Sequence, residues 1–233
     1  MGQTVPVSAP DQVGDEGRLV AAWTRHLAAL APGVPRPELE SAGRDLLARY
    51  AEPHRAYHDA THLAEVLAAV DLLAAHADDV PVVVAAAWWH DAVYDVTAAA
   101  GVNESASADL AERTLTGWAT AGHGVDPHRA ARVADLVRMT AHHDPRPGDH
   151  DAEVLSDADL AVLAADPDRY ARYVSDVRRE YAHVPDSAFA TGRAAVLHGL
   201  LAHDRLYRTP RGHDRWEERA RANLAQELAA LRR

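Results

Sequence analysis

The stretch VVVAAAWWHD occupies residues 82–91 and is apolar at every position except its last two. It follows Asp79, Val80 and Pro81, where we expect the helix to start. A helix that is apolar on all sides is usually central to a fold, so the pattern predicts a core helix through residues 82–90. His90 and Asp91 then stand where burial of polar groups would be costly. The doublet is therefore a candidate pair of metal ligands.

Helical periodicity dominates the rest of the chain. Apolar residues recur at three- and four-residue spacing, no segment alternates like a strand, and no internal repeat appears. We predict one all-α domain of about ten helices over residues 16–233, after a flexible lead-in at residues 1–15. The expected helices lie near residues 20–30, 38–50, 59–77, 82–90, 104–120, 127–141, 158–165, 167–182, 187–204 and 213–232.

The chain is acidic and contains no cysteine. Its formal net charge of -11 argues against nucleic acid or an anionic membrane as the main partner. A small phosphorylated substrate remains compatible, because a metal or local positive charge can bind one. No stretch approaches the ~20 apolar residues of a membrane span, and residues 1–14 lack a signal-peptide pattern. The absence of cysteine fits a cytoplasmic protein and leaves His, Asp, Glu or water as metal ligands.

A second histidine cluster, YHDATH at residues 57–62, opens a long amphipathic segment. His58 and His62 are four residues apart and would share one face of a helix. Further carboxylates follow at Asp157 and Asp159, which cannot easily both reach one metal from a helix. Two histidines and two aspartates form a mixed nitrogen and oxygen set. Such a set suits Mn, Fe, Co, Ni, Zn or Mg better than a structural zinc site, which more often uses sulfur.

The order His, His-Asp, Asp on an all-helical chain resembles the HD superfamily of metal-dependent phosphohydrolases. The phrase YHDATHLAEV, residues 57–66, is also similar to the Tyr-His-Asn-x-x-His-Ala-x-x-Val signature of cyclic-nucleotide phosphodiesterases, which belong to that superfamily. The resemblance implies an HD-type bundle in which His62, His90 and Asp91 bind the metal. It also implies that His58 protonates the leaving group.

The last ligand is implied by the same resemblance. ADLA, residues 158–161, resembles the Ala-Asp-Leu-Ser phrase that carries the final Asp ligand of those enzymes. This favours Asp159, while Asp157 is the alternative; the residue that does not bind would cap a helix or orient a ligand. Aromatic and acidic residues downstream fall in register with those enzymes without a gap: Tyr170, Tyr173, Glu180 and Tyr181.

The overall layout, over roughly residues 20–232, most resembles a subgroup of predicted metal-dependent phosphohydrolases. The matching phrases are HDAVYD (90–95), NESA (103–106), TAHH (140–143), DADL (157–160), GR (192–193) and ARANL (220–224). The chain departs from its relatives in three ways. Asp59 replaces the phosphodiesterase Asn, Tyr94 stands where 5′-nucleotidase relatives carry Glu, and the His after their His-Asp-x-Asp phrase is absent. The last difference counts against a second metal.

Three further residues are candidates, each with a plainer alternative. His143, next to His142, could approach the metal or a phosphate, or could simply be a polar helix end. Glu104 could orient water, or be a first-turn acid favoured by the helix dipole. Arg193 could reach a phosphate, or form a surface ion pair.

The resemblance implies a hydrolase that cleaves a phosphate ester of a nucleotide or another small molecule. A divalent metal would present hydroxide to phosphorus and offset the developing charge, and Asp91 or Asp159 could share the proton of the water. One alternative is a non-catalytic HD-like module that binds a nucleotide and signals through a partner. Another is an oxidative di-iron enzyme, which would need His143 and Glu104 as extra ligands. A homo-oligomer is compatible with the sequence.

Overall fold

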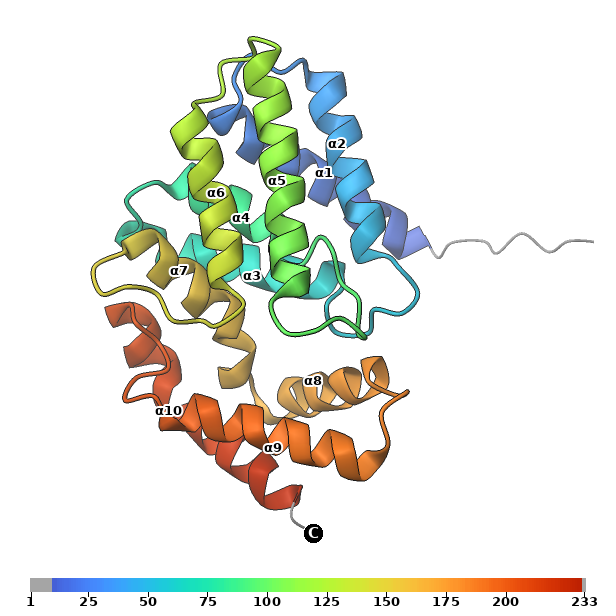
Figure 1. The fold of residues 1–233 in the computed structure, drawn as a ribbon, viewed down its shortest axis with the longest axis vertical. Coiled ribbons are helices and arrows are strands. Elements are labelled where there is room, and N and C mark those ends of the chain that lie inside the picture. Colours follow the sequence, from blue (N-terminus) through green and yellow to red (C-terminus); the bar gives the residue numbers. More distant parts are fainter. Residues whose placement is uncertain (1–9, 232–233) are drawn as a thin grey trace, which may run out of the picture.

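The computed structural model describes residues 10–231, which form ten α-helices and two 3₁₀ helices and contain no strand (Figure 1). The all-α prediction is confirmed. Residues 1–9, most of the predicted lead-in, lie outside the described residues, and the first helix already includes residue 10. The elements are α1 (Pro10–Leu30), α2 (Arg36–Tyr50), α3 (Ala60–Leu73), η1 (Ala74–His76), α4 (Val80–Trp89), α5 (Val102–Thr120), α6 (Pro127–Met139), α7 (His150–Asp159), η2 (Leu160–Ala164), α8 (Pro167–Glu180), α9 (Asp186–Ala202) and α10 (Pro210–Ala230).

Helix α4 is the central element, as its apolar sequence predicts. Pro81 lies in its first turn, and the Asp79 carboxylate accepts a hydrogen bond from the backbone N–H of Val82 at 3.2 Å. The helix packs against α1, α3, α5, α6 and α7. At its end, Trp88 and Trp89 meet the ring of Trp23 edge-on, with centroids 5.4 and 5.1 Å apart. The chain therefore leaves α4 inside the core, which places His90 at a buried position.

The buried apolar side chains form two clusters. The larger lies among α1 to α7, and the smaller lies among η2, α8, α9 and α10. Figure 1 shows the last three of these helices grouped at one end of the molecule. Tyr57 belongs to the smaller cluster, although α3, which begins three residues later, contributes to the larger one. The loop that carries His58 consequently lies where the two clusters meet.

The predicted helix near residues 158–165 was placed too late in the sequence. Helix α7 begins at His150, where the Asp149 carboxylate accepts from the backbone N–H of Ala152 at 3.1 Å, and it ends at Asp159. Its first turn is charged and lacks the apolar residues that usually reveal a helix start. Asp159 is thus the last residue of a helix rather than part of its first turn. Among residues 10–231, no helix combines the length and apolar character needed to span a membrane.

Candidate metal centre

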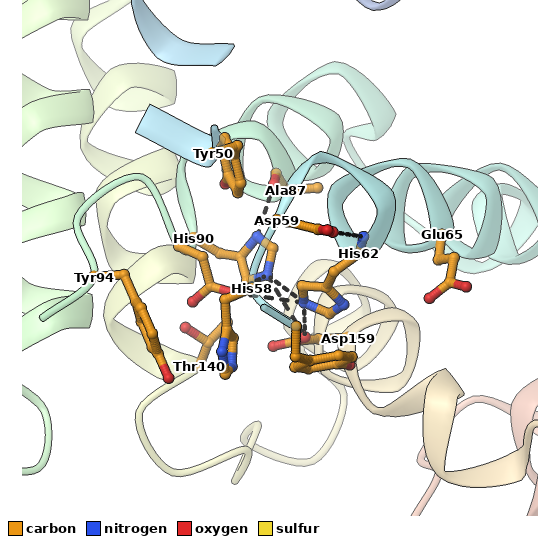
Figure 2. Close-up of polar contacts among 12 residues, drawn as sticks. Tyr50, His58, Asp59, His62, Glu65, Ala87, His90, Tyr94, Thr140 and Asp159 are labelled. Carbon is orange, nitrogen blue, oxygen red and sulfur yellow. Dashed lines mark hydrogen bonds and ion pairs between the residues drawn. The ribbon is translucent and has the colours of Figure 1, made fainter. Parts of the chain in front are cut away.

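His62 is fixed by the N-terminal cap of α3. The Asp59 carboxylate accepts hydrogen bonds from the backbone N–H groups of Thr61 and His62, at 2.8 and 3.1 Å. Asp and Asn are about equally good N-caps, so a capping role is compatible with either residue at this position. The His62 side chain is 2% exposed and points toward the end of α4 (Figure 2). The N-cap and the geometry of the first turn of α3 thus place this imidazole in the core.

Ligand atoms of four side chains converge at one point. The Nε2 atoms of His62 and His90 are 3.2 Å apart. Asp91 Oδ2 lies 3.5 and 3.1 Å from these two nitrogens, and Asp159 Oδ1 lies 3.1 and 3.6 Å from them. Ligands held about 2.1 Å from one metal ion are about 3.0–3.5 Å apart when they occupy neighbouring positions. The group formed by His62, His90 and Asp91 could therefore hold a metal ion, and Asp159 lies against the same two imidazoles.

The tautomer of His90 suits a ligand. Its Nδ1 lies 2.8 Å from the backbone oxygen of Ala87, which can only accept a hydrogen bond (Figure 2). Nδ1 must therefore carry a proton, and in the neutral imidazole the lone pair is left on Nε2. Histidine ligands are commonly oriented by such a contact to a backbone carbonyl. The Nε2 atom faces the convergence point described above.

The four groups are electrostatically interdependent. Burial alone would lower the pKa of His62, but Asp159 and Asp91 outweigh burial and raise it to about 9. The same carboxylates raise the pKa of His90, again against the effect of burial. In return, His90 and its neighbours hold the pKa values of Asp91 and Asp159 well below their usual range. The two carboxylates thus favour a positive charge between them, supplied by a proton or by a metal ion.

Asp159 and Asp157 have different positions, as their spacing on α7 requires. Asp157 is fully buried, and its carboxylate accepts from the backbone N–H of Arg208 at 2.7 Å and from the backbone N–H and hydroxyl of Thr209 at 2.8 and 2.7 Å. Thr209 is the N-cap of α10. Asp157 therefore anchors α10 to α7, while Asp159 faces the two histidines. The alternative of Asp157 as a ligand is at odds with this arrangement.

His58 lies beside the centre but precedes α3. The prediction that it shares a helix face with His62 is therefore wrong, although the two rings are only 5.8 Å apart. Its Nδ1 donates to Glu180 Oε2 at 2.7 Å. The side chain is 23% exposed and lines a pocket of about 220 Å³ that is also bordered by Asp91 and Asp159. With Nδ1 occupied, Nε2 is the atom of His58 available to a ligand.

Glu180 organises the loop that carries His58, a role that the sequence did not reveal. Its Oε1 accepts from three successive backbone N–H groups, those of residues 56, 57 and 58, at 2.8, 2.8 and 2.9 Å. Its Oε2 accepts from His58 and from the hydroxyl of Tyr94, the latter at 2.8 Å. Burial would raise the pKa of Glu180, but His58 and the backbone donors lower it to about 2.

Arg55 is a second residue that sequence reasoning missed. Its guanidinium donates to the backbone oxygens of His58 and Asp91, at 3.0 and 2.7 Å, and its side chain is fully buried. It also lies over the rings of Tyr50 and Tyr94. Arg55 therefore ties together the two histidine phrases, which are separated along the chain by most of α3 and α4. Only its proximity to YHDATH hinted at this function.

His143 and Glu104 line the same pocket of about 220 Å³. His143 Nε2 lies 3.5 Å from Asp159 Oδ2, the oxygen of that carboxylate that does not approach His62. Its backbone has a φ of 49°, in the left-handed region that non-glycine residues rarely adopt. The chain leaves α6 through this turn, so the structure brings His143 to the centre rather than leaving it as a polar helix end.

Arg193 lies in the pocket wall but is not a surface ion pair, its plainer predicted role. The guanidinium donates to Glu227 at 2.7 and 3.1 Å and to the hydroxyl of Tyr173 at 2.9 Å, and the side chain is 9% exposed. Glu227 therefore neutralises this cation. Arg193 borders both the first pocket and a second one of about 430 Å³, which shares Tyr57, His58, Tyr173 and Val196 with it.

Comparisons with protein-family models, curated proteins and solved structures found no match to this chain.

Proposed function

We propose that this protein is a metal-dependent hydrolase of phosphate esters, of the HD type that its sequence resembles. The observation that carries the proposal is the convergence of His62, His90, Asp91 and Asp159 on one point beside a pocket. A structural ion would be expected to lie in a closed cage. Here Asp91 and Asp159 are 16% and 15% exposed and border open space, which leaves room for water and substrate.

A divalent metal bound by these residues would lower the pKa of water and polarise a phosphoryl oxygen. The chain itself supplies the remaining functions. His58, held at Nδ1 by Glu180, would donate a proton from Nε2 to the leaving oxygen. The negative charges of Asp91 and Asp159 would offset the positive charge of the metal. Arg193, already paired with Glu227, would shape the pocket rather than bind a phosphate by itself.

The two adjoining pockets favour a substrate with two chemically different ends. The pocket against Asp91 and Asp159 contains several charged and polar side chains, among them Glu104 and His143. The larger pocket is lined mainly by apolar and aromatic side chains, among them Val177, Tyr181 and Phe189. A phosphoryl group near the carboxylates would place the alcohol that leaves beside His58, at the boundary between the pockets. Esters of bulky or aromatic alcohols, nucleosides among them, fit this layout.

The test is a panel of phosphomonoesters and phosphodiesters with small and aromatic leaving groups. Each should be assayed with Mn, Co, Ni, Mg and Zn after removal of bound metal. We expect metal-dependent release of phosphate or of the alcohol for at least one aromatic ester. Failure of every combination would contradict the hydrolase proposal and favour a module that binds its ligand without turnover.

Filling the larger pocket should separate substrates by size. Ala188 is exposed in that pocket, so Ala188→Trp should raise the KM for an aromatic ester by about tenfold or more, the cost of losing one good apolar contact. Small alkyl phosphates should be hydrolysed as before. Ala225→Trp, on an exposed position of α10, is the matched control. An equal effect of Ala188→Trp on small and aromatic esters would contradict this placement of the leaving group.

A second candidate is a two-metal centre, favoured by one observation. The two oxygens of Asp159 face different histidines, Oδ1 toward His62 and Oδ2 toward His143. A carboxylate in this position can bridge two ions, and Glu104 borders the same space. Metal content per chain distinguishes the cases: His143→Ala should remove one bound ion from a two-metal centre and none from a one-metal centre. A redox-active iron pair in the wild type would move the proposal toward oxidative chemistry.

A further inference from the structure

A second group of metal-binding side chains lies away from the centre described above. It consists of His76, at the end of η1, and His150 and Glu153, in the first turn of α7. One ligand atom from each residue lies within 4.8 Å of the other two. His150 and Glu153 are three residues apart on a helix and therefore share a face. The third ligand comes from a different segment, so the group joins two parts of the chain.

Contacts within the group fix the orientations of the His76 and Glu153 side chains. His76 Nε2 lies 2.7 Å from Glu153 Oε2, and the rings of His76 and His150 are 4.7 Å apart. The other carboxylate oxygen of Glu153 accepts from the backbone N–H of Gly148 at 3.1 Å. Side-chain exposures of 26% for His76 and 13% for Glu153 indicate restricted positions, whereas His150 is 43% exposed. A ligand would reach the group from the His150 side.

The surroundings are acidic. Asp78 Oδ1 lies 3.2 Å from His150 Nδ1 and could supply an additional oxygen ligand. Asp151 accepts from the backbone N–H groups of Asp78 and Asp79, which fixes the turn after η1. Arg129 pairs with Asp79, and Arg132 pairs with Asp149. Arg132 also lies 4.0 Å from Asp151 Oδ2, whereas Asp78 and Glu153 pair with His150 and His76. A divalent cation would therefore offset the negative charges of Asp78 and Glu153.

We propose that His76, His150 and Glu153 form a separate zinc site that stabilises the packing of α7. Two imidazoles and a carboxylate suit Zn²⁺ and disfavour Mg²⁺ and Ca²⁺, which prefer oxygen ligands alone. The site ties the end of η1 to the beginning of α7. His150 and Glu153 lie nine and six residues before Asp159, so they are about 14 and 9 Å from it along α7. Zinc here would hold in place the helix that presents Asp159.

The experiment measures zinc bound per chain in the untagged full-length protein, against a competing chelator. The His62→Ala background weakens the first centre, so the zinc that remains reports the second. We expect one equivalent in His62→Ala and a loss of affinity by more than about 100-fold after the additional change His76→Gln or Glu153→Gln, since even outer-shell partners of a metal contribute 10- to 100-fold. His128→Gln, an exposed histidine of α6, is the matched control in the same background.

Thermal unfolding gives an independent readout. Zinc should raise the Tm of His62→Ala by several degrees, on the order of 5 °C at saturating metal, and should leave that of His62→Ala/His76→Gln unchanged. No bound zinc in His62→Ala, or the same zinc content with and without His76, would overturn the proposal. The outcome is independent of turnover, because zinc content and Tm are measured without any substrate. A protein without hydrolase activity could still show the zinc site.

Discussion

Replacement of Asp91 by Asn is expected to abolish both metal retention at the first centre and hydrolysis. The substitution keeps the size of the side chain but removes the negative charge that lies 3.1 and 3.5 Å from His90 and His62. Metal activation of a nucleophile and of the phosphoryl group is worth several kcal/mol, and each 1.4 kcal/mol corresponds to tenfold in rate. We therefore expect kcat/KM to fall by about 10³ or more. His62→Ala should have the same effect through loss of a nitrogen ligand.

The measurements are metal content by elemental analysis and hydrolysis of the best ester from the panel. Asp214→Asn, at an exposed position of α10, is the matched control and should change neither. Circular dichroism should show that Asp91→Asn remains folded, since Asp91 borders the pocket and its side chain is partly exposed. Full activity in either Asp91→Asn or His62→Ala would refute the proposed centre.

The sequence predicted the parts of this protein that depend on local pattern. The apolar stretch before His90 predicted a central helix because no face of it could meet water. The helix expected over residues 59–77 was also found, although Asp59 caps α3 instead of belonging to it. Asp159 was favoured over Asp157 only through resemblance, and the distances to His62 and His90 agree with that preference. Residues two positions apart on a helix point to nearly opposite sides, which is why only one of the two carboxylates reaches the centre.

Contacts between distant segments could not be predicted from local sequence patterns. Glu180 reaches a loop more than a hundred residues earlier, and Arg55 joins two loops through backbone oxygens that carry no sequence signature. The start of α7 was missed because a charged first turn carries no apolar period. The His76 group escaped notice for a related reason: its members are single polar residues on separate elements, and only the packing of η1 against α7 brings them together.

Glu180→Gln is expected to impair both stability and catalysis, because one carboxylate holds five donors. The pKa of Glu180 is lowered to about 2 in the folded protein, against an ordinary value of 4.5. A carboxyl group whose pKa is lowered by folding stabilises the fold at pH values above its pKa in the unfolded state. This stabilisation is lost as the pH falls toward the pKa in the folded state. The difference corresponds to about 3 kcal/mol of unfolding free energy at pH 7. Urea denaturation should therefore show a difference in unfolding free energy between wild type and Glu180→Gln at pH 7. This difference should narrow between pH 4.5 and 2.

The control Glu218→Gln, on an exposed position of α10, should have the same unfolding free energy as the wild type at both pH values. Catalysis provides a second readout that a purely structural role would not affect. If Glu180 orients His58 as proton donor, its loss should slow alkyl phosphates by about 10²-fold, within the range expected for general acid catalysis. Nitrophenyl esters, whose leaving group needs little protonation, should be slowed far less, and His58→Ala should show the same dependence on the leaving group. Equal slowing of both ester types would leave Glu180 with a structural role only, because an acid that acts on the leaving oxygen must discriminate between good and poor leaving groups.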